Sequence, residues 1–388
     1  MDLTNKRTLW YFGLESLASR YTGQLTNEWA PAAFETFNDK IEFVNIPGDD
    51  KEHGDVAVGM VLDAVGRGIY SMSQVQYFLN LIRKGQVKEN DIVYFADFWT
   101  PGIESIFYAL DLYKIKNVKF YARNWAQSMD EYDFTYEMRN WMRWYELGLD
   151  SKLSGIFCGS TEHKNLMVQA GFKAPIHVLS LPVHKQMTLD KLGTRFYNKR
   201  NVVAYTSRLD KEKNPYFMLQ VAEKFLELNP EWEWVVTTSS SKLRSNVSGV
   251  TDAVYALAEK NPRFKVYENL SKDQYYQVLS EAKIQFNSAL QDWVSFTCIE
   301  STMYDCDIVY PDFRSFKEFV PKDRKYHAFD VDDAVYTLCY AKDTLKTYSY
   351  ISDIADLGLH LEGYIMANDI TSELNVWQET EFCNTLLK

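Results

Sequence analysis

The stretch VVAYTSRLDKEKNP, residues 202–215, has the pattern of a buried strand followed by the start of a helix, and this pattern predicts the fold. Its first residues, 202–206, are β-branched, aromatic or small and apolar, as in a strand buried on both faces. Asn214 and Pro215 are then typical of an N-cap followed by proline in the first helical turn. The apolar positions that continue with helical spacing are Phe217, Val221, Phe225 and Leu228. A strand that leads directly into a helix is typical of a parallel α/β sheet.

Strand-like and helical segments alternate along the whole chain. In the first half the apolar strand-like segments are 8–12, 41–46, 91–96, 118–122, 155–159 and 176–180. In the second half they are 202–206, 233–238, 264–268, 284–288 and 307–311. Helical patterns such as 73–84 and 102–113 lie between them. The alternation predicts an α/β protein with two Rossmann-like doubly wound domains that face a central cleft.

A polar, basic stretch at 184–200 separates the two series and is the predicted linker. The predicted domains are an amino-terminal one at 1–185, a carboxy-terminal one at 186–345, and a tail at 346–388 that is helical to its end and packs back on the first domain. A chain of 388 residues is long enough for two cores. Ligands of such folds bind beyond the carboxyl ends of the strands, so we expect the site there.

Composition excludes several classes of protein. A net charge of −11 argues against a surface that binds nucleic acid throughout, so any such contact must be local. The five cysteines show no C-x-x-C pair, which favours neither a disulfide framework nor a zinc ribbon. No segment has the length of a membrane-spanning helix or the apolar core of a signal peptide. The expected location is the cytoplasm, with no membrane partner.

Arg208 and Lys213 lie at the junction between the strand and the helix. The amino terminus of a helix carries partial positive charge, so two cations beside it could hold a diphosphate. The competing interpretation is a solvated turn in which both cations pair with Asp210 and Glu212. Taken alone, the stretch favours the paired turn.

A second polar segment, 287–320, supplies two carboxylates. Asp292 lies in a loop after a strand, and Glu300 lies on a helix that begins at about Phe296. Carboxylates accept hydrogen bonds from vicinal diols, so one could hold a ribose and the other a transferred sugar. The first amides of the helix, from Ser295 to Thr297, could face phosphates.

In order and spacing, these segments resemble the retaining glycosyltransferases of the B fold, of the family-four type, over about residues 200–322. The resemblance implies that Arg208 and Lys213 bind the donor diphosphate. The family's Glu-x7-Glu signature is Asp292-x7-Glu300 here. It implies that Glu300 binds the donor ribose and that Asp292 lies near the transferred sugar.

The segment 266–289 is similar to the family's stretch whose first loop, Glu268 to Leu270, meets the nucleobase. Arg208, Lys213 and Asp292 are the predicted catalytic residues. The predicted donor-binding residues are Arg208, Lys213, Glu268, Leu270, Asp292, Ser295, Phe296, Thr297 and Glu300.

The chain departs from the family pattern in two places. Trp293, Val294 and Ser295 replace a loop that often contains glycine in the family, and Asp292 is one methylene shorter than glutamate, which leaves the donor sugar open. Where many members have a histidine, the stretch 121–127 has Arg123 and Asn124, so no catalytic histidine is carried over.

The amino-terminal half resembles tailed-phage glycosyltransferase-like proteins, through an E-x4-RYT stretch from Glu15 to Thr22 and the blocks 61–74, 95–105 and 130–146. These blocks are rich in polar groups just past strand ends, as an acceptor site would be. The predicted acceptor-binding residues are Arg20, Arg67, Asp97, Arg123 and Asp130. As structural alternatives, Asp97 would cap a helix, Arg67 would close a turn, and Asp130 would begin a helix.

The segment EMRNWMRWYE, 137–146, has two interpretations. Arg139 and Arg143 with Trp141 and Trp144 could contact a flipped base or a DNA backbone. The favoured interpretation is an amphipathic helix whose aromatic residues are core.

The sequence therefore predicts a retaining glycosyltransferase that needs no cofactor and no metal ion. It would transfer a sugar from a nucleotide diphosphate, expected to be UDP, to 5-hydroxymethylcytosine in double-stranded phage DNA. The alternatives are a saccharide or small-metabolite acceptor, a nucleotide-sugar epimerase, and a non-catalytic nucleotide- or DNA-binding protein of the same fold. The acidic stretches 305–307 and 330–333 are attributed to a strand start and a helix start, not to metal binding.

Overall fold

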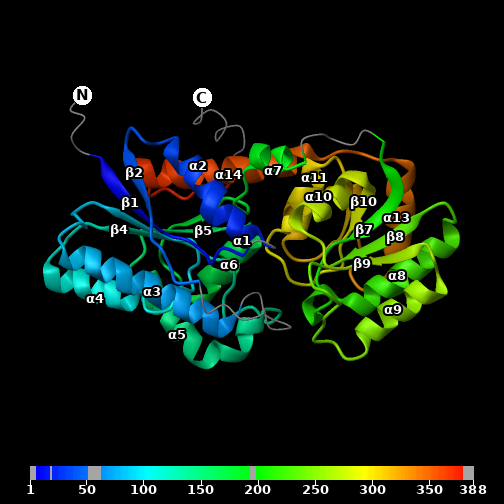
Figure 1. The fold of residues 1–388 in the computed structure, drawn as a ribbon, viewed down its shortest axis with the longest axis horizontal. Coiled ribbons are helices and arrows are strands. Elements are labelled where there is room, and N and C mark those ends of the chain that lie inside the picture. The colour runs from blue at the N-terminus through cyan, green and yellow to red at the C-terminus, as the bar shows by residue number, and fades with distance from the viewer. Residues whose placement is uncertain (1–5, 18–19, 51–62, 193–197, 379–388) are drawn as a thin grey trace. The chain divides into compact units, whose positions relative to one another are not determined.

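The computed structural model describes residues 6–17, 20–50, 63–192 and 198–378. The chain divides into two compact units. Unit 1 comprises residues 1–184 and 356–388, and unit 2 comprises residues 185–355. Each unit contains a parallel sheet with helices packed on it (Figure 1).

Unit 1 is built on a six-stranded parallel sheet of order β2-β1-β3-β4-β5-β6. Its strands are β1 (Arg7–Phe12), β2 (Ile41–Asn45), β3 (Ile92–Phe95), β4 (Lys119–Arg123), β5 (Gly155–Cys158) and β6 (Ile176–Val178). The central strands β3 and β5 are buried at every residue, as expected when helices cover both faces of a sheet.

The helices of unit 1 lie on both sides of this sheet, with α3 and α4 on one side and α2 and α14 on the other (Figure 1). They are α1 (Tyr21–Gln24), the π-helix η1 (Leu25–Trp29), α2 (Ala30–Glu35), α3 (Ala64–Arg83), α4 (Glu104–Tyr113), the 3-10 helix η2 (Phe134–Met138), α5 (Arg139–Asp150), α6 (Thr161–Ala170) and α14 (Ser349–Asn368). Phe12, Phe78, Phe95 and Phe120 are at the centre of one hydrophobic core.

Unit 2 repeats the arrangement with a sheet of order β12-β11-β10-β7-β8-β9. Its strands are β7 (Arg200–Tyr205), β8 (Glu233–Thr237), β9 (Phe264–Tyr267), β10 (Ala282–Phe286), β11 (Asp307–Pro311) and β12 (Lys325–Tyr326). Its helices are α7 (Lys185–Asp190), η3 (Lys211–Lys213), α8 (Pro215–Leu228), α9 (Val250–Lys260), α10 (Lys272–Glu281), α11 (Phe296–Met303), α12 (Phe316–Phe319), η4 (Lys322–Arg324) and α13 (Val331–Asp343). Tyr205, Phe225, Trp234 and Phe286 are in its core.

The predicted fold class is confirmed, and each of the eleven predicted strand segments contains a strand. Asn214 differs from the prediction: its backbone is left-handed (φ 49°), and its side chain makes no capping hydrogen bond. The 3-10 turn η3 ends at this residue, and asparagine is among the few residues that adopt the left-handed conformation readily.

The prediction that the tail is helical to its end is wrong. Helix α14 ends at Asn368, and Asn375 forms a parallel bridge with Val178 of β6. The Val178 amide donates to the Leu374 carbonyl, and the Val376 amide donates to the Val178 carbonyl, both at 2.8 Å. Because β6 is an edge strand, these residues satisfy backbone groups that would otherwise be unpaired.

Helix α14 is fixed to unit 1 by a buried ion pair. Arg123 donates from Nε to Glu362 Oε1 at 2.7 Å and from Nη1 to the Ser180 carbonyl at 2.7 Å, and Tyr94 donates to Glu362 Oε2 at 2.8 Å. Arg123 and Glu362 are almost completely buried. At Gly358 a Cβ would collide with the Leu179 carbonyl oxygen, so glycine allows the close approach of α14.

We predict that Glu362→Gln lowers the free energy of unfolding by roughly 3–5 kcal/mol, because it leaves the Arg123 charge buried without a counter-ion. Urea unfolding of the full chain measures this. Asp111→Asn is the control, since its ion pair with Lys152 is exposed and should contribute at most about 1 kcal/mol. Equal losses in the two variants would contradict the prediction.

Candidate functional site

The strand order of unit 2 defines where a ligand would bind. From β7 the chain adds β8 and β9 on one side, and then returns to add β10, β11 and β12 on the other. The carboxyl ends of β7 and β10 therefore flank the point at which the order reverses, the usual ligand site of such sheets. Arg208 and Lys213 follow β7, and Asp292 follows β10.

Hydrogen bonds join the turn after β7 to the loop after β10. Lys213 donates from Nζ to the Gln291 carbonyl at 2.8 Å and lies 2.9 Å from Asp292 Oδ1. Its own carbonyl accepts from Ser288 Oγ at 2.7 Å. The side chain of Lys213 is 9% exposed and that of Asp292 is 25% exposed. The structure thus brings two of the three predicted catalytic residues together.

Arg208, the third, is held within its own turn. Its guanidinium donates to Asp210 Oδ2 at 2.9 Å and to Glu212 Oε1 at 2.7 Å. For Arg208 this is the paired turn that the sequence favoured when the stretch was taken alone, whereas Lys213 pairs with Asp292 and not with Asp210 or Glu212. The side chain is 38% exposed, so a diphosphate can reach it but must compete with these carboxylates.

The start of α11 lies on the same loop. Ser295 is the N-cap residue, and its hydroxyl lies 2.8 Å from Thr297 Oγ1, which lies 3.3 Å from the Tyr310 hydroxyl. Trp293 is buried, and the Arg314 guanidinium lies 5.2 Å from its ring centroid. The first amides of a helix have no partner within the helix, so this end suits a phosphate. Phe296, the first residue of α11, is half-buried.

Glu300 is buried and fully engaged. Its carboxylate accepts from Lys272 Nζ at 2.6 Å, from the Tyr275 hydroxyl at 2.7 Å and from the Tyr276 hydroxyl at 3.2 Å. Burial, followed by the Glu300 charge, raises the pKa of Tyr275 well above its usual value, so the hydroxyl remains a donor.

The sequence reasoning missed these three donors. On α10, Tyr275 follows Lys272 by three positions and Tyr276 follows it by four. Side chains at these spacings lie on the same face of a helix. The sequence 266–289 contains this spacing, which could have predicted the three donors. The family resemblance concerns only the loop before the helix, Glu268 to Leu270.

Glu268 and Leu270 lie in the loop after β9. Glu268 accepts from the Leu243 amide at 2.9 Å and from the Tyr255 hydroxyl at 2.5 Å, and the Leu270 amide donates to the Thr238 carbonyl at 3.1 Å. These contacts tie the loop to the segment after β8.

Unit 1 has a comparable reversal of strand order between β1 and β3. Glu15 follows β1 and Asp97 follows β3, and Arg67 of α3 lies between them. Arg67 donates to Glu15 Oε2 at 2.8 Å, to Asp97 Oδ2 at 3.3 Å and to the Trp99 carbonyl at 3.2 Å. Two predicted acceptor residues, Arg67 and Asp97, therefore meet at the position where a ligand is expected.

Of the other predicted acceptor residues, Arg20 lies near this cluster. It is half-buried at the N-cap position of α1, and its neighbour Tyr21 feels the charges of Asp97, Arg20, Glu15 and Arg67. Arg123 and Asp130 are fully buried, Arg123 in the pair with Glu362 and Asp130 in a turn where it accepts from the Tyr132 amide at 3.1 Å. Because neither side chain reaches the surface, we revise the assignment of Arg123 and Asp130 from acceptor binding to structure.

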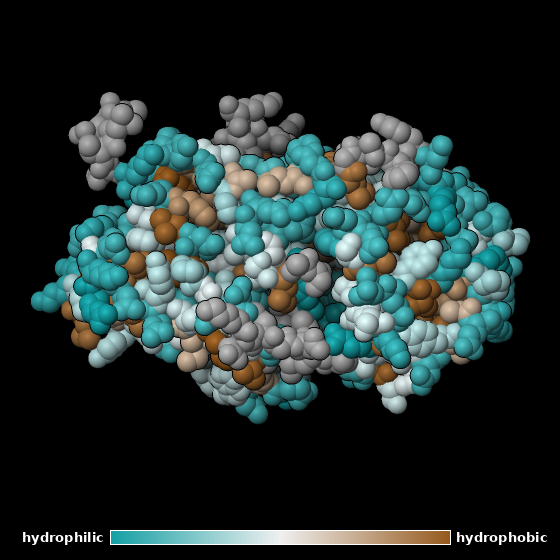
Figure 2. Space-filling view, in the orientation of Figure 1, coloured by the Kyte–Doolittle hydropathy of each residue, from teal (hydrophilic) through white to brown (hydrophobic). Residues whose placement is uncertain are grey.

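The interpretation of Trp141 and Trp144 as core residues is wrong. Trp141 is 55% exposed and Trp144 is 67% exposed. Figure 2 shows hydrophilic and hydrophobic groups mixed over the face of the molecule in view. The buried face of α5 carries Met142, Glu146 and Leu149 instead.

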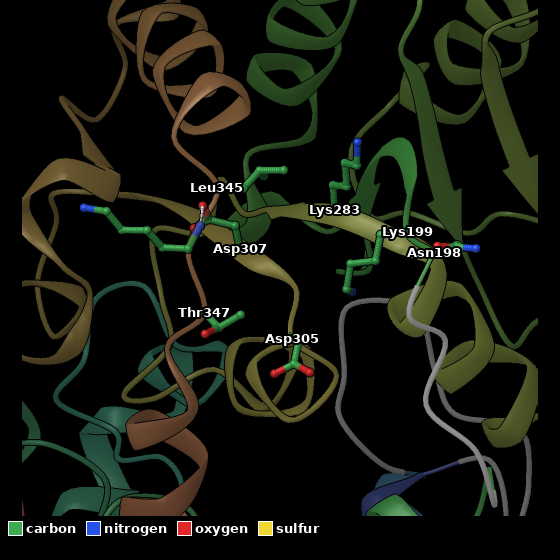
Figure 3. A pocket seen from close by; sticks show the side chains of 8 residues that line it. Asn198, Lys199, Lys283, Asp305, Asp307, Leu345 and Thr347 are labelled. Carbon is green, nitrogen blue, oxygen red and sulfur yellow. Dashed lines mark hydrogen bonds between the residues drawn. The ribbon is translucent and has the colours of Figure 1, made fainter.

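A separate hollow of about 730 Å³ lies at the amino ends of β7, β10 and β11. Its lining residues are Asn198, Lys199, Lys283, Asp305, Asp307, Leu345, Lys346 and Thr347. Figure 3 shows Lys199 directed toward the side of the hollow on which Asp305 and Thr347 lie, and Lys283 directed away. Lys199 donates to the Ala282 carbonyl at 2.7 Å, and Asp307 accepts from Arg324 at 2.9 Å. These charges already have structural partners.

The described residues contain no group of three His, Cys, Asp or Glu side chains that could hold a metal ion. In the same residues, none of the helices combines the length and the apolar character that a membrane span requires.

Comparison with known proteins gives the fold a name. No protein-family profile matches the chain, and neither does any curated protein sequence. Among solved structures, the pneumococcal O-GlcNAc transferase GtfA in complex with UDP and GlcNAc superposes with a TM-score of 0.60 at 9% identity, over 98% of this chain and 99% of that chain. Sucrose-phosphate synthase from Thermosynechococcus elongatus superposes with a TM-score of 0.57 at 11% identity, over 98% and 99%.

Both units of this chain are matched in these superpositions, which decides the architecture. The chain has the glycosyltransferase B fold. A third B-fold structure, Anabaena HepE in complex with UDP-glucose, has a TM-score of 0.58 at 11% identity, over 94% of this chain and 100% of that chain. At these identities the likeness establishes the B fold of the chain and nothing finer.

We predict that Lys272→Met lowers the free energy of unfolding, because the buried Glu300 carboxylate loses its counter-ion. Removing one partner of a buried ion pair leaves an uncompensated buried charge, which is strongly destabilising.

Urea unfolding measures the loss, expected to be about 3–5 kcal/mol. Lys283→Met is the matched control, because the partner of Lys283 is the uncharged Asn201 side chain. A loss for Lys272→Met no larger than that of the control would rule out the ion pair as its cause.

Proposed function

We propose that the protein is a retaining glycosyltransferase that transfers a sugar from a UDP-sugar to a hydroxyl acceptor without a metal ion. The observation that carries the proposal is the junction of Lys213, Asp292 and the start of α11 at the reversal point of the second sheet. The structures of GtfA with UDP and of HepE with UDP-glucose support a UDP-linked donor, because they share this fold.

In this proposal unit 2 binds the donor. Lys213 and Arg208 contact the diphosphate, together with the amides at Ser295 to Thr297. In the unliganded protein both cations are neutralised by Asp292, Asp210 and Glu212. These internal ion pairs hold the cations in place before the donor binds. Phosphate oxygens of the bound donor would then replace the carboxylates in part.

Glu300 accepts from the ribose hydroxyls, and Asp292 lies near the transferred sugar. The ribose must compete with Lys272 and Tyr275 for the Glu300 oxygens, or bind beside them. The loop from Glu268 to Leu270 contacts the nucleobase. Each of these roles follows from the family resemblance and is part of the proposal.

The chemical step is same-face displacement. The acceptor hydroxyl oxygen bonds to the anomeric carbon as the bond from that carbon to the β-phosphate oxygen breaks. The electron pair of the broken bond stays on the phosphate, which takes the proton of the acceptor hydroxyl. Negative charge therefore grows on the diphosphate, where Arg208 and Lys213 stabilise it.

The acceptor suggested by the phage resemblance is 5-hydroxymethylcytosine in double-stranded DNA, and a saccharide or small metabolite is the alternative. The proposal includes a cytoplasmic location, that of the host cell if a phage encodes the chain. Epimerisation of the donor and nucleotide binding without turnover remain the competing activities.

Mass analysis of products separates these activities. The purified protein is incubated with UDP-sugars and with hydroxymethylcytosine DNA, with free saccharides, or with no acceptor. Transfer of a hexose or pentose mass to an acceptor is expected. A new UDP-sugar isomer without any transfer would favour an epimerase, and unchanged UDP-sugar in all arms would favour a binding protein.

We predict that Arg208→Ala and Lys213→Ala each weaken UDP binding by about 10- to 150-fold, since a hydrogen bond to a charged group contributes about 1.5–3 kcal/mol. Isothermal titration with UDP measures the change. Lys211→Ala is the matched control, because Lys211 is an exposed lysine of the same turn. If both variants bind UDP as the control does, the diphosphate assignment is wrong.

We predict that Glu300→Gln weakens binding of UDP more than binding of inorganic diphosphate, because only UDP carries the ribose. The same titration measures both ligands, and circular dichroism checks the fold. An equal loss for the two ligands would point to a general disturbance of the site.

A further inference from the structure

We propose that Glu15, Arg67 and Asp97 form an acceptor subsite that holds an uncharged saccharide by its hydroxyl groups. Asp97 touches the hydroxyl, whereas Arg67 and Glu15 are positioning residues. The inference rests on the proposed transferase function, and it selects the saccharide acceptor over 5-hydroxymethylcytosine in DNA.

The burial of the three side chains assigns their roles. Glu15 is fully buried, and the side chain of Arg67 is 10% exposed and that of Asp97 is 17% exposed. A ligand can therefore reach Asp97 but not Glu15. The Asp97 carboxylate is already oriented, because Oδ1 accepts from the Trp99 amide at 2.9 Å and Oδ2 accepts from Arg67 at 3.3 Å.

The hydrogen-bonding groups of the cluster are not all satisfied, as they would be in a purely structural cluster. Glu15 Oε1 and Arg67 Nε are buried and have no hydrogen-bond partner among the described residues. Each such atom costs roughly 1–3 kcal/mol of stability. Glu15 and Asp97 carry two negative charges against the single guanidinium that contacts them, and Arg20 at α1 is a further cation near the cluster. Unfavourable polar groups at the reversal point of a sheet are typical of a binding site.

The accessible carboxylate of Asp97 selects the ligand. A carboxylate accepts hydrogen bonds from hydroxyls and repels phosphates. In the neighbouring segment 130–146, the acidic residues that are not buried are Glu131, Asp133 and Glu137, against two arginines, so the segment adds no cationic rim for a nucleic-acid strand. These charges favour a neutral, hydroxyl-rich acceptor over a phosphate-bearing one.

An aromatic surface adjoins Asp97. Trp99 stacks on Tyr145 with 4.8 Å between ring centroids and meets the edge of Trp141 at 5.8 Å. Trp141 is more than half exposed, and Trp144 on the next turn of α5 is exposed as well. Exposed aromatic faces beside a few fixed polar groups are suited to the apolar face of a sugar ring.

The subsite should be sensitive to pH. Burial raises the pKa of Asp97 to about 6, so both of its oxygens accept hydrogen bonds above this pH, whereas the protonated group below it is a weaker acceptor. Within the cluster, Arg67 and Glu15 act on Asp97 directly, and further charged or titratable groups near it are Arg20 and Tyr21 at α1 and Tyr70 on α3. Burial raises the pKa of Tyr70 to about 12 and that of Tyr21 further, so both remain neutral near pH 6.

The first test measures binding without catalysis. Maltose, lactose and cellobiose, a 6-phosphorylated disaccharide, and a hydroxymethylcytosine oligonucleotide are titrated into the full-length protein by ligand-observed NMR. At least one neutral disaccharide should bind at least about 10-fold more tightly than the phosphorylated one, with affinity falling as pH drops through about 6. Preferred binding of the phosphorylated sugar or of the oligonucleotide overturns the inference, as does the absence of disaccharide binding.

Variants test the residue roles. Asp97→Asn should weaken disaccharide binding at least about 10-fold and leave UDP binding unchanged. Glu15→Gln should move the acid limb of disaccharide binding to lower pH, because Arg67 then acts on Asp97 alone. Asp111→Asn, at an exposed site of the same unit, is the control. If the Asp97 variant does not fold, the pH dependence of the wild-type protein still decides.

The two proposals fail in different ways. Disaccharide binding without any affinity for UDP would remove the proposed function and leave the subsite. Affinity for UDP without disaccharide binding would remove the subsite and leave the donor site. Unchanged disaccharide affinity in a folded Asp97→Asn variant would also remove the subsite.

Discussion

Lys213 links the two segments that make up the candidate donor site. Its carbonyl accepts from Ser288, and its ammonium group donates to Gln291 and pairs with Asp292, so both ends of one residue join the turn after β7 to the loop after β10. The two strands are neighbours in the sheet although they lie far apart in sequence. Because the loop then enters α11 directly, the same contacts also fix the helix start at which a phosphate would bind.

The sheets were predictable from the sequence because their strands are continuous apolar runs, and burial on both faces requires such runs. The two-residue strand β12 is too short to give a pattern, and it was missed. Trp141 and Trp144 were placed in the core because residue type favours burial, whereas the helix turns Met142 and Leu149 inward. The strand-like tail residues 374–376 have no signal of their own, since the open edge of β6 determines their pairing.

For the candidate site, the sequence supplied the residues but not their partners. It placed Arg208, Lys213 and Asp292 at strand ends, and the sheet order then brings them to one reversal point. It did not predict that Lys272, Tyr275 and Tyr276 surround Glu300, because no known motif includes that face of α10. Arg123 shows the reverse error: a charged residue at a strand end resembles a ligand contact, but a partner 239 residues later in the chain neutralises it.

That distance along the chain bears on biosynthesis. Unit 1 is discontinuous, so during translation all six strands of its sheet and then unit 2 leave the ribosome before residue 362 appears. Until then Arg123 has no counter-ion, and the edge of β6 is uncovered. The buried ion pair and the covered edge of unit 1 can therefore form only after unit 2 has been synthesised.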